Sequence, residues 1–135
     1  CIREVPIVAT TYPDEHLLRD YFVSLERFHH EFKECLLLPA HGKEISDAKK
    51  VIDRIVFSYL DKVEIMHNIL EHSRKARTIR EIATIVYGMP HPPKDTAEFI
   101  KLKMIMSKCF SCLEYLRDED FAVREEKDGT FYWRP

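Results

Sequence analysis

A single histidine follows a short apolar run in residues 36–42 (Leu-Leu-Leu-Pro-Ala-His-Gly), an order that can present an imidazole to a cleft. Residues 35–38 predict a short strand. Pro39 lacks a backbone donor and ends strand pairing, and Gly42 allows a sharp turn beside His41. The pattern therefore predicts that His41 is delivered from the edge of a sheet into a cleft. The alternative is an ordinary surface histidine, and the surrounding sequence has to decide between the two.

Cys109 and Cys112 form a Cys-x-x-Cys pair, a spacing that can bind zinc or carry out disulfide exchange. A structural zinc site would need two more ligands, and the sequence has no second pair of this kind. A redox pair would lie at the start of a helix, whereas this pair lies deep within a predicted helix beside Phe110 and Leu113. We therefore predict two small buried apolar residues. Four cysteines in all favour free thiols, as in intracellular proteins, over a disulfide framework.

No two histidines of the chain are four residues apart, the spacing that would place both on one face of a helix. Exposed helix or loop positions are therefore predicted for His29, His30, His67, His72 and His91. The sequence contains no recognisable serine nucleophile, phosphate-binding loop or pair of catalytic carboxylates.

The elements that must position these residues are mostly helical in the first half of the chain. Residues 5–9 form a short apolar run that predicts a strand. Apolar residues three and four apart predict a helix over residues 13–32, with Pro13 in its first turn. A second apolar stripe predicts one long helix, or two nearly collinear helices, over residues 46–71, with Ser46 as the N-cap.

The second half predicts two further helices and a hairpin. Thr78 and Glu81 form a capping box that begins a helix ending at Gly88. A similar signature at Asp95 begins a long helix that continues to about residue 116. Two short strands then flank the turn residues 128–129 (Asp-Gly). Three helices followed by a hairpin is the order of a winged helix-turn-helix, so the predicted fold class is mostly α (α+β).

Composition and charge limit the partners. The chain of 135 residues suits one domain or one and a half, and it has no apolar run long enough to span a membrane. The formal net charge is −2, but residues 74–117 contain 9 Lys+Arg against 4 Asp+Glu, a net +5. These basic residues could contact phosphates. However, the predicted third helix lacks side chains suited to base edges, and the wing carries Glu125, Glu126 and Asp128. A protein contact involving Met104, Met106 and Tyr115 is favoured instead.

The turn at residues 39–42 and the segment Tyr-Phe-Val-Ser-Leu-Glu-Arg at residues 21–27 together resemble the C-terminal part of metallo-beta-lactamase-fold hydrolases. In that superfamily a late strand ends in a Pro-Gly-His-Gly-type turn whose histidine is a metal ligand, and this chain has Ala40 in place of the first glycine. The resemblance is to the subgroup that carries a winged-helix tail, and it covers nearly the whole chain.

The resemblance implies a fold, a cofactor and a reaction. Residues 1–45 would be the C-terminal remnant of the αββα domain, and residues 46–135 a linking helix plus the winged helix. His41 would be one ligand of a site holding two zinc ions. Zinc-bound hydroxide would attack an ester, thioester or phosphodiester of a small molecule or nucleic acid. The winged helix would line the active-site rim, bind substrate or form a homodimer.

The first metal motif of that superfamily, His-x-His-x-Asp-His, does not occur in this sequence. We therefore expect the chain to be a C-terminal fragment that cannot bind zinc or catalyse hydrolysis by itself. The alternative function is that of a non-catalytic winged-helix module that binds nucleic acid or a protein partner.

Overall fold

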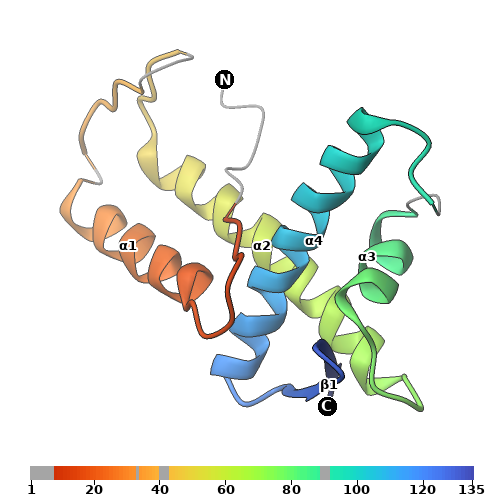
Figure 1. Ribbon diagram of the computed structural model, residues 1–135. Coiled ribbons are helices and arrows are strands. Elements are labelled where there is room, and N and C mark those ends of the chain that lie inside the picture. Colours follow the sequence, from red (N-terminus) through yellow and green to blue (C-terminus); the bar gives the residue numbers. More distant parts are fainter. Residues whose placement is uncertain (1–7, 33, 40–42, 89–91) are drawn as a thin grey trace.

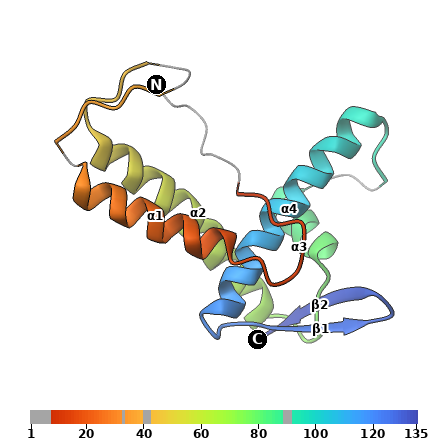
Figure 2. The ribbon, with the colours of Figure 1, turned by 60° about the vertical axis from the view of Figure 1, so that its left-hand side comes forward.

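The computed structural model describes residues 8–32, 34–39, 43–88 and 92–135, which form four helices and a C-terminal antiparallel hairpin. The elements are α1 (Leu17–Glu31), α2 (Ala48–Glu71), α3 (Ile79–Tyr87), α4 (Thr96–Asp118), β1 (Val123–Lys127) and β2 (Thr130–Arg134). Helices α1 and α2 lie side by side, and α4 crosses them (Figures 1 and 2). The mostly helical fold class is thus confirmed. Within the described ranges, no helix is both long and apolar enough to cross a membrane.

Helix α1 begins at Leu17, four residues later than the sequence predicts. The reason is a turn at Asp14, whose φ of 64° is incompatible with an α-helix. The turn is held by the Glu15 carboxylate, which accepts hydrogen bonds from the backbone N–H groups of Thr11 and Tyr12 at 3.1 and 3.2 Å. Pro13 therefore lies in a turn and not in the first turn of a helix.

The strand predicted at residues 35–38 is not formed. This segment makes one antiparallel bridge, in which Leu37 and Ile45 exchange backbone hydrogen bonds of 3.0 and 2.9 Å. Leu36 and Leu38 remain exposed, because the described residues provide no neighbouring strand against which a sheet could grow. The strand predicted at residues 5–9 is described only at its last two residues, which have no regular secondary structure.

Helix α2 is one continuous helix, the first of the two predicted alternatives, but its N-cap is Asp47 and not Ser46. The Asp47 carboxylate accepts a hydrogen bond of 2.9 Å from the Lys50 N–H. At α3 the predicted capping box is confirmed, with Thr78 and Glu81 each bonding the other's backbone N–H. Gly88 ends α3 with a left-handed φ of 61°.

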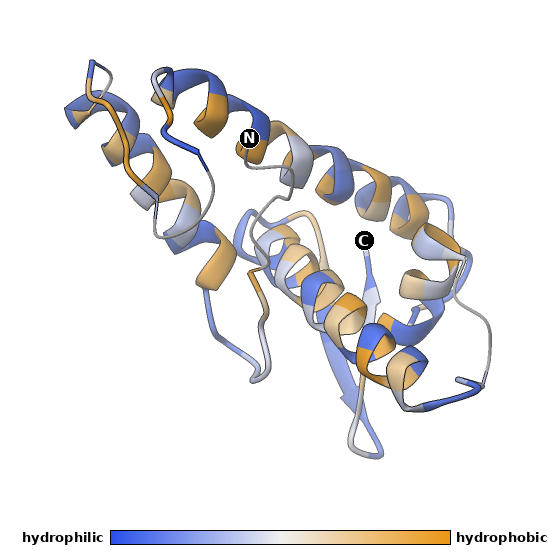
Figure 3. Cartoon of the chain, turned by 90° about the horizontal axis from the view of Figure 1, so that it is seen from above, coloured by the Kyte–Doolittle hydropathy of each residue, from blue (hydrophilic) through white to orange (hydrophobic). Residues whose placement is uncertain are grey.

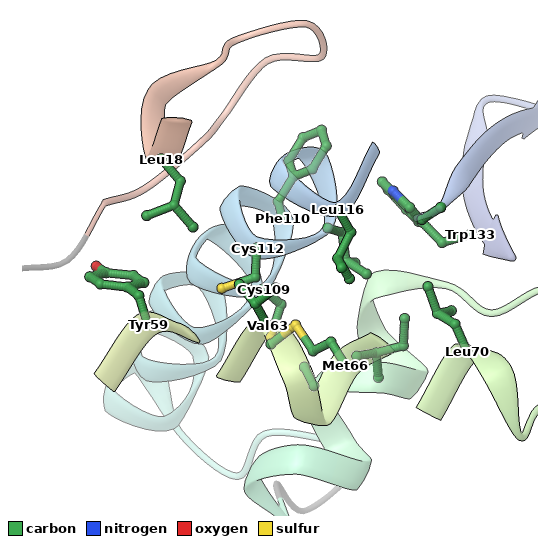
Figure 4. Close-up of a cluster of buried hydrophobic side chains, with 14 of the residues drawn as sticks. Leu18, Tyr59, Val63, Met66, Leu70, Cys109, Phe110, Cys112, Leu116 and Trp133 are labelled. Carbon is green, nitrogen blue, oxygen red and sulfur yellow. The ribbon is translucent and has the colours of Figure 1, made fainter. Parts of the chain in front are cut away.

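The hydrophobic core lies between α2 and α4 and is closed by the hairpin and by α1 (Figure 4). Leu18 and Tyr59 mark one end of the core, and Leu70 and Trp133 mark the other. The helices show orange apolar stripes and blue polar stripes in Figure 3, because their apolar residues recur at helical spacing.

The second half of α4 is buried on all sides, from Cys109 to Glu114. Helices α1, α2 and α3 all contact α4. The segment before α1 covers a further side: the Thr10 N–H donates to Ser111 Oγ at 2.9 Å, and Ser111 Oγ donates to the Val8 carbonyl at 2.7 Å. Helix α4 is therefore the central element of the fold.

The predicted hairpin is confirmed, with its turn at Asp128 (φ 51°) and Gly129 (φ 71°). Positive φ at both turn residues is the type I′ geometry that matches the twist of the flanking strands. Strand β2 gains a second neighbour at Trp133, which exchanges two backbone hydrogen bonds of 2.8 Å with Arg77. The segment between α2 and α3 thereby anchors the hairpin.

Candidate functional site

His41, the predicted zinc ligand, lies outside the described residues, and its assignment stays a prediction. Among residues 8–32, 34–39, 43–88 and 92–135, no three His, Cys, Asp or Glu side chains gather closely enough to hold a metal ion. The antiparallel bridge between Leu37 and Ile45 joins the described residues that precede and follow residues 40–42.

Two histidines form hydrogen bonds that hold the ends of helices in place. His16 Nδ1 lies 2.7 Å from an Asp118 carboxylate oxygen, which ties the start of α1 to the end of α4. His72 Nδ1 lies 2.8 Å from the Asn68 carbonyl oxygen, at the C-terminal end of α2. Both contacts are explained by the fold itself, without a ligand.

The histidines predicted to be exposed differ in their surroundings. His30 and His72 are exposed, as predicted, whereas His29 and His67 are half-buried. The ring of His67 packs edge-on against Phe121, with centroids 5.3 Å apart. The expectation that His67 is a simple exposed residue is therefore wrong.

Cys109 and Cys112 are both fully buried, as the sequence predicts. Burial raises the pKa of each thiol to about 12. At neutral pH both thiols therefore stay protonated, and the protonated form is a poor nucleophile and a poor metal ligand. Cys35 is exposed, and none of these three cysteines forms a disulfide.

We expect Cys35 to react with iodoacetamide in the native protein, whereas Cys109 and Cys112 react only after unfolding. The physical reason is that the thiolate is the reactive species, and burial suppresses it at the two helical positions. Peptide mass spectrometry after labelling, with and without urea, measures the modification of each residue separately. Labelling of Cys109 at the rate of Cys35 in the native protein would contradict the buried assignment.

A cluster of ion pairs joins three parts of the chain. The buried Glu114 of α4 lies 2.8 Å from an Arg124 nitrogen and 3.1 Å from an Arg117 nitrogen. Both arginines also contact the Asp14 carboxylate, and the Asp14 N–H donates to Glu114 at 3.2 Å. These hydrogen bonds and charges lower the pKa of Asp14, with the hydrogen bond from Arg117 as the largest cause. The cluster fixes the turn before α1 against α4 and β1.

The basic residues proposed to contact phosphates are partly paired. Lys75 lies 3.0 Å from a Glu81 carboxylate oxygen, and Arg77 donates to the Ser73 hydroxyl at 2.9 Å. The tip of the hairpin carries Glu126 and Asp128, which would repel a phosphate backbone. Lys75 and Arg77 are thus engaged within the fold, and nucleic-acid binding stays an untested alternative.

The residues predicted to contact a protein partner differ in their exposure. Met104 is exposed, but Met106 and Tyr115 are half-buried and pack against the core. Two other apolar residues of α4, Phe99 and Ile100, are about half exposed. The exposed apolar surface of α4 is therefore confined to its first half.

The solved structures that match this arrangement include the following two. A beta-lactamase domain protein from Burkholderia ambifaria matches with a TM-score of 0.78 and 20% sequence identity over 95% of this chain. A metallo-beta-lactamase family protein from Thermus thermophilus matches with a TM-score of 0.72 and 19% identity over 98% of this chain. The fold is that of the C-terminal part of such proteins.

The chain spans only 37% and 38% of the length of these two proteins. No family model matches the sequence, and no curated protein matches it significantly. At this level of identity the likeness concerns the fold, and catalytic chemistry does not follow from it.

Proposed function

We propose that this chain is the C-terminal region of a metal-dependent hydrolase of the metallo-beta-lactamase superfamily, acting on an ester, thioester or phosphodiester. The observation that carries the proposal is the match in fold over 95% of the chain to a beta-lactamase domain protein. The motif at residues 39–42 supports the proposal independently of the fold, because its resemblance to the superfamily is one of sequence.

His41 is proposed as one zinc ligand. Catalytic zinc sites use about three protein ligands, so one histidine does not make a site. Among the described residues, no three His, Cys, Asp or Glu side chains form a metal-binding group of their own. The other ligands would have to come from the remaining length that the two matched proteins have and this chain lacks. No step of hydrolysis is therefore assigned to residues of this chain.

The proposal divides the chain at residues 45 and 46. Residues 1–45 would complete the αββα domain, and the linking helix would begin at residue 46. The order of α2, the bridge at Arg77, α3, α4 and the hairpin is that of a winged helix. Exposed apolar side chains at Val23, Leu36 and Leu38 favour a covering domain over the first part of the chain.

Replacing His41 by alanine in the full-length protein is expected to lower its zinc content and abolish hydrolysis, because a zinc ion loses one ligand. Metal analysis of the purified protein and an esterase assay measure the two effects. His30→Ala is the matched control, because His30 is an exposed residue of α1. Unchanged zinc content and activity in His41→Ala would remove this residue from the site.

A second candidate function is binding of a protein partner, which could be another copy of this chain, through the winged helix. The exposed Phe99, Ile100 and Met104 on the first half of α4 favour it. The acidic hairpin tip argues against nucleic acid as the partner of the winged helix. A mass that rises with concentration in light scattering would support self-association, and salt-sensitive binding to duplex DNA or RNA would favour nucleic acid instead.

A further inference from the structure

A hollow of about 400 Å³ opens between the middle of α2 and the end of α4. Its floor is apolar and includes Val63 and Leu116. Aromatic rings and two carboxylates stand around this floor. The volume falls in the range of small-ligand sites. The predicted metal ligand, His41, is not among the residues that line the hollow, so the ligand proposed for it is argued without the hydrolase proposal.

Two aromatic rings of the hollow are held in place by neighbouring elements. Phe121 follows a left-handed Asp120 (φ 61°), and its N–H donates to the Leu116 carbonyl at 2.8 Å. The Asp120 N–H donates to the Arg117 carbonyl at 3.1 Å, which completes a Schellman C-cap. The His67 ring of α2 then packs edge-on against Phe121, at 65°. The wall formed by Phe121 and His67 therefore has a defined geometry, although Phe121 is about half exposed.

The third ring is that of Tyr115. It packs edge-on against Phe22 of α1, with centroids 5.2 Å apart and planes at 87°. Burial, and to a lesser extent the negative charge of Glu119, raise the pKa of the Tyr115 hydroxyl. Glu119 follows Tyr115 by four residues, about one helical turn, and both side chains line the hollow.

The charge around the hollow is negative. Glu64 lines it from α2, and Glu119 lines it from the C-cap of α4. Among the described residues, neither carboxylate has a hydrogen-bond or ion-pair partner. The C-terminal end of α4 adds the negative pole of its helix dipole. The nearest cation along α4, Arg117, is paired with Glu114 and Asp14.

We propose that this hollow binds an alkylated ammonium group, a cation with an apolar body. The faces of aromatic rings attract such cations, and the apolar floor accommodates their methyl groups. Glu64 and Glu119 provide the opposite charge. An anion would be repelled by both carboxylates, and a neutral apolar ligand would cover them without compensating their lost hydration. A metal ion is disfavoured, because no three ligating side chains converge there in the part of the chain that the structure describes.

The test compares choline with its neutral carbon analogue, 3,3-dimethylbutan-1-ol, in NMR titrations of this chain. Choline is expected to bind saturably and to shift the signals of His67, Tyr115 and Phe121. The neutral analogue should bind about fivefold more weakly, because cation–π attraction at a partly exposed site contributes about 1 kcal/mol. A peptide containing trimethyllysine, titrated in parallel, distinguishes a protein side chain from a free small molecule as the source of the group.

Two variants locate the site. Glu119→Gln and Phe121→Leu are each expected to weaken choline binding severalfold, because the first removes a charge and the second a ring. Glu26→Gln is the matched control: it removes an equal charge from an exposed position of α1 outside the hollow. Circular dichroism checks that each variant is folded. Equal binding of choline and its neutral analogue, or equal effects of Glu119→Gln and Glu26→Gln, would overturn the proposal.

Discussion

Replacing Trp133 by alanine is expected to lower the free energy of unfolding by about 3–5 kcal/mol, the usual range when a buried tryptophan is truncated. The side chain is fully buried, and its ring packs edge-on against Phe110 and Phe131, with centroids 5.6 and 6.0 Å away. Alanine would leave a cavity where the hairpin meets α4. The backbone bonds to Arg77 would remain, but they would join elements no longer packed together.

Urea unfolding followed by circular dichroism measures this loss, because Trp133 is the single tryptophan and its fluorescence disappears with the substitution. Trp133→Phe is the control. It keeps an aromatic ring and removes an indole N–H that has no hydrogen-bond partner among the described residues. Its effect should therefore be much smaller than that of alanine. A loss below about 1 kcal/mol for Trp133→Ala would mean that the hairpin is not part of the core.

Replacing Arg124 by leucine is expected to lower the free energy of unfolding by about 3 kcal/mol, because it removes one partner of a buried ion pair. Glu114 has only 2% of its side chain exposed and lies 2.8 Å from the Arg124 guanidinium. One Glu114 oxygen, Oε1, already lacks a partner within the described ranges. Without Arg124, the carboxylate would keep only Arg117 and the Asp14 N–H as partners among the described residues. The guanidinium also stacks on Phe131, with its carbon 4.6 Å from the ring centre.

Arg134→Leu is the control for Arg124→Leu, because it removes an ion pair from the same hairpin. Arg134 lies 2.6 Å from Glu125, but both side chains are about half exposed, so the expected loss is below about 1 kcal/mol. In a double-mutant cycle, Glu114→Leu combined with Arg124→Leu should cost less than the sum of the two single variants. Additive losses, or equal losses for Arg124→Leu and Arg134→Leu, would contradict the importance of the buried pair.

Local signals explain what could be predicted from the sequence. The capping box at Thr78 and Glu81, the turn at residues 128–129 and the apolar stripe of α2 are each built from residues close together along the chain. Such patterns act over one turn of a helix or one hairpin, so they survive in the final fold. The helix start predicted at Pro13 was wrong because contacts with distant side chains hold a turn there. The N-cap predicted at Ser46 was wrong because the next residue, Asp47, caps α2 instead.

Features that depend on distant contacts could not be predicted. Asp14 and Arg124 are 110 residues apart, and no sequence pattern pairs them. The apolar run at residues 35–38 has the composition of a strand, but a strand needs a neighbour, and the described residues offer only one bridge. The hollow beside His67 was missed because its rings and carboxylates come from α2 and from the end of α4.

The amino-acid order thus determines the four helices, the hairpin and the burial of the Cys109–Cys112 pair, since periodicity, caps and turn residues are local properties. Only the tertiary structure decides that the second half of α4 is covered on all sides and that Glu114 is paired. It alone also brings the Phe121 ring to His67 beside the carboxylates of Glu64 and Glu119. These outcomes depend on how helices pack across a hundred residues of chain, which local preferences do not specify.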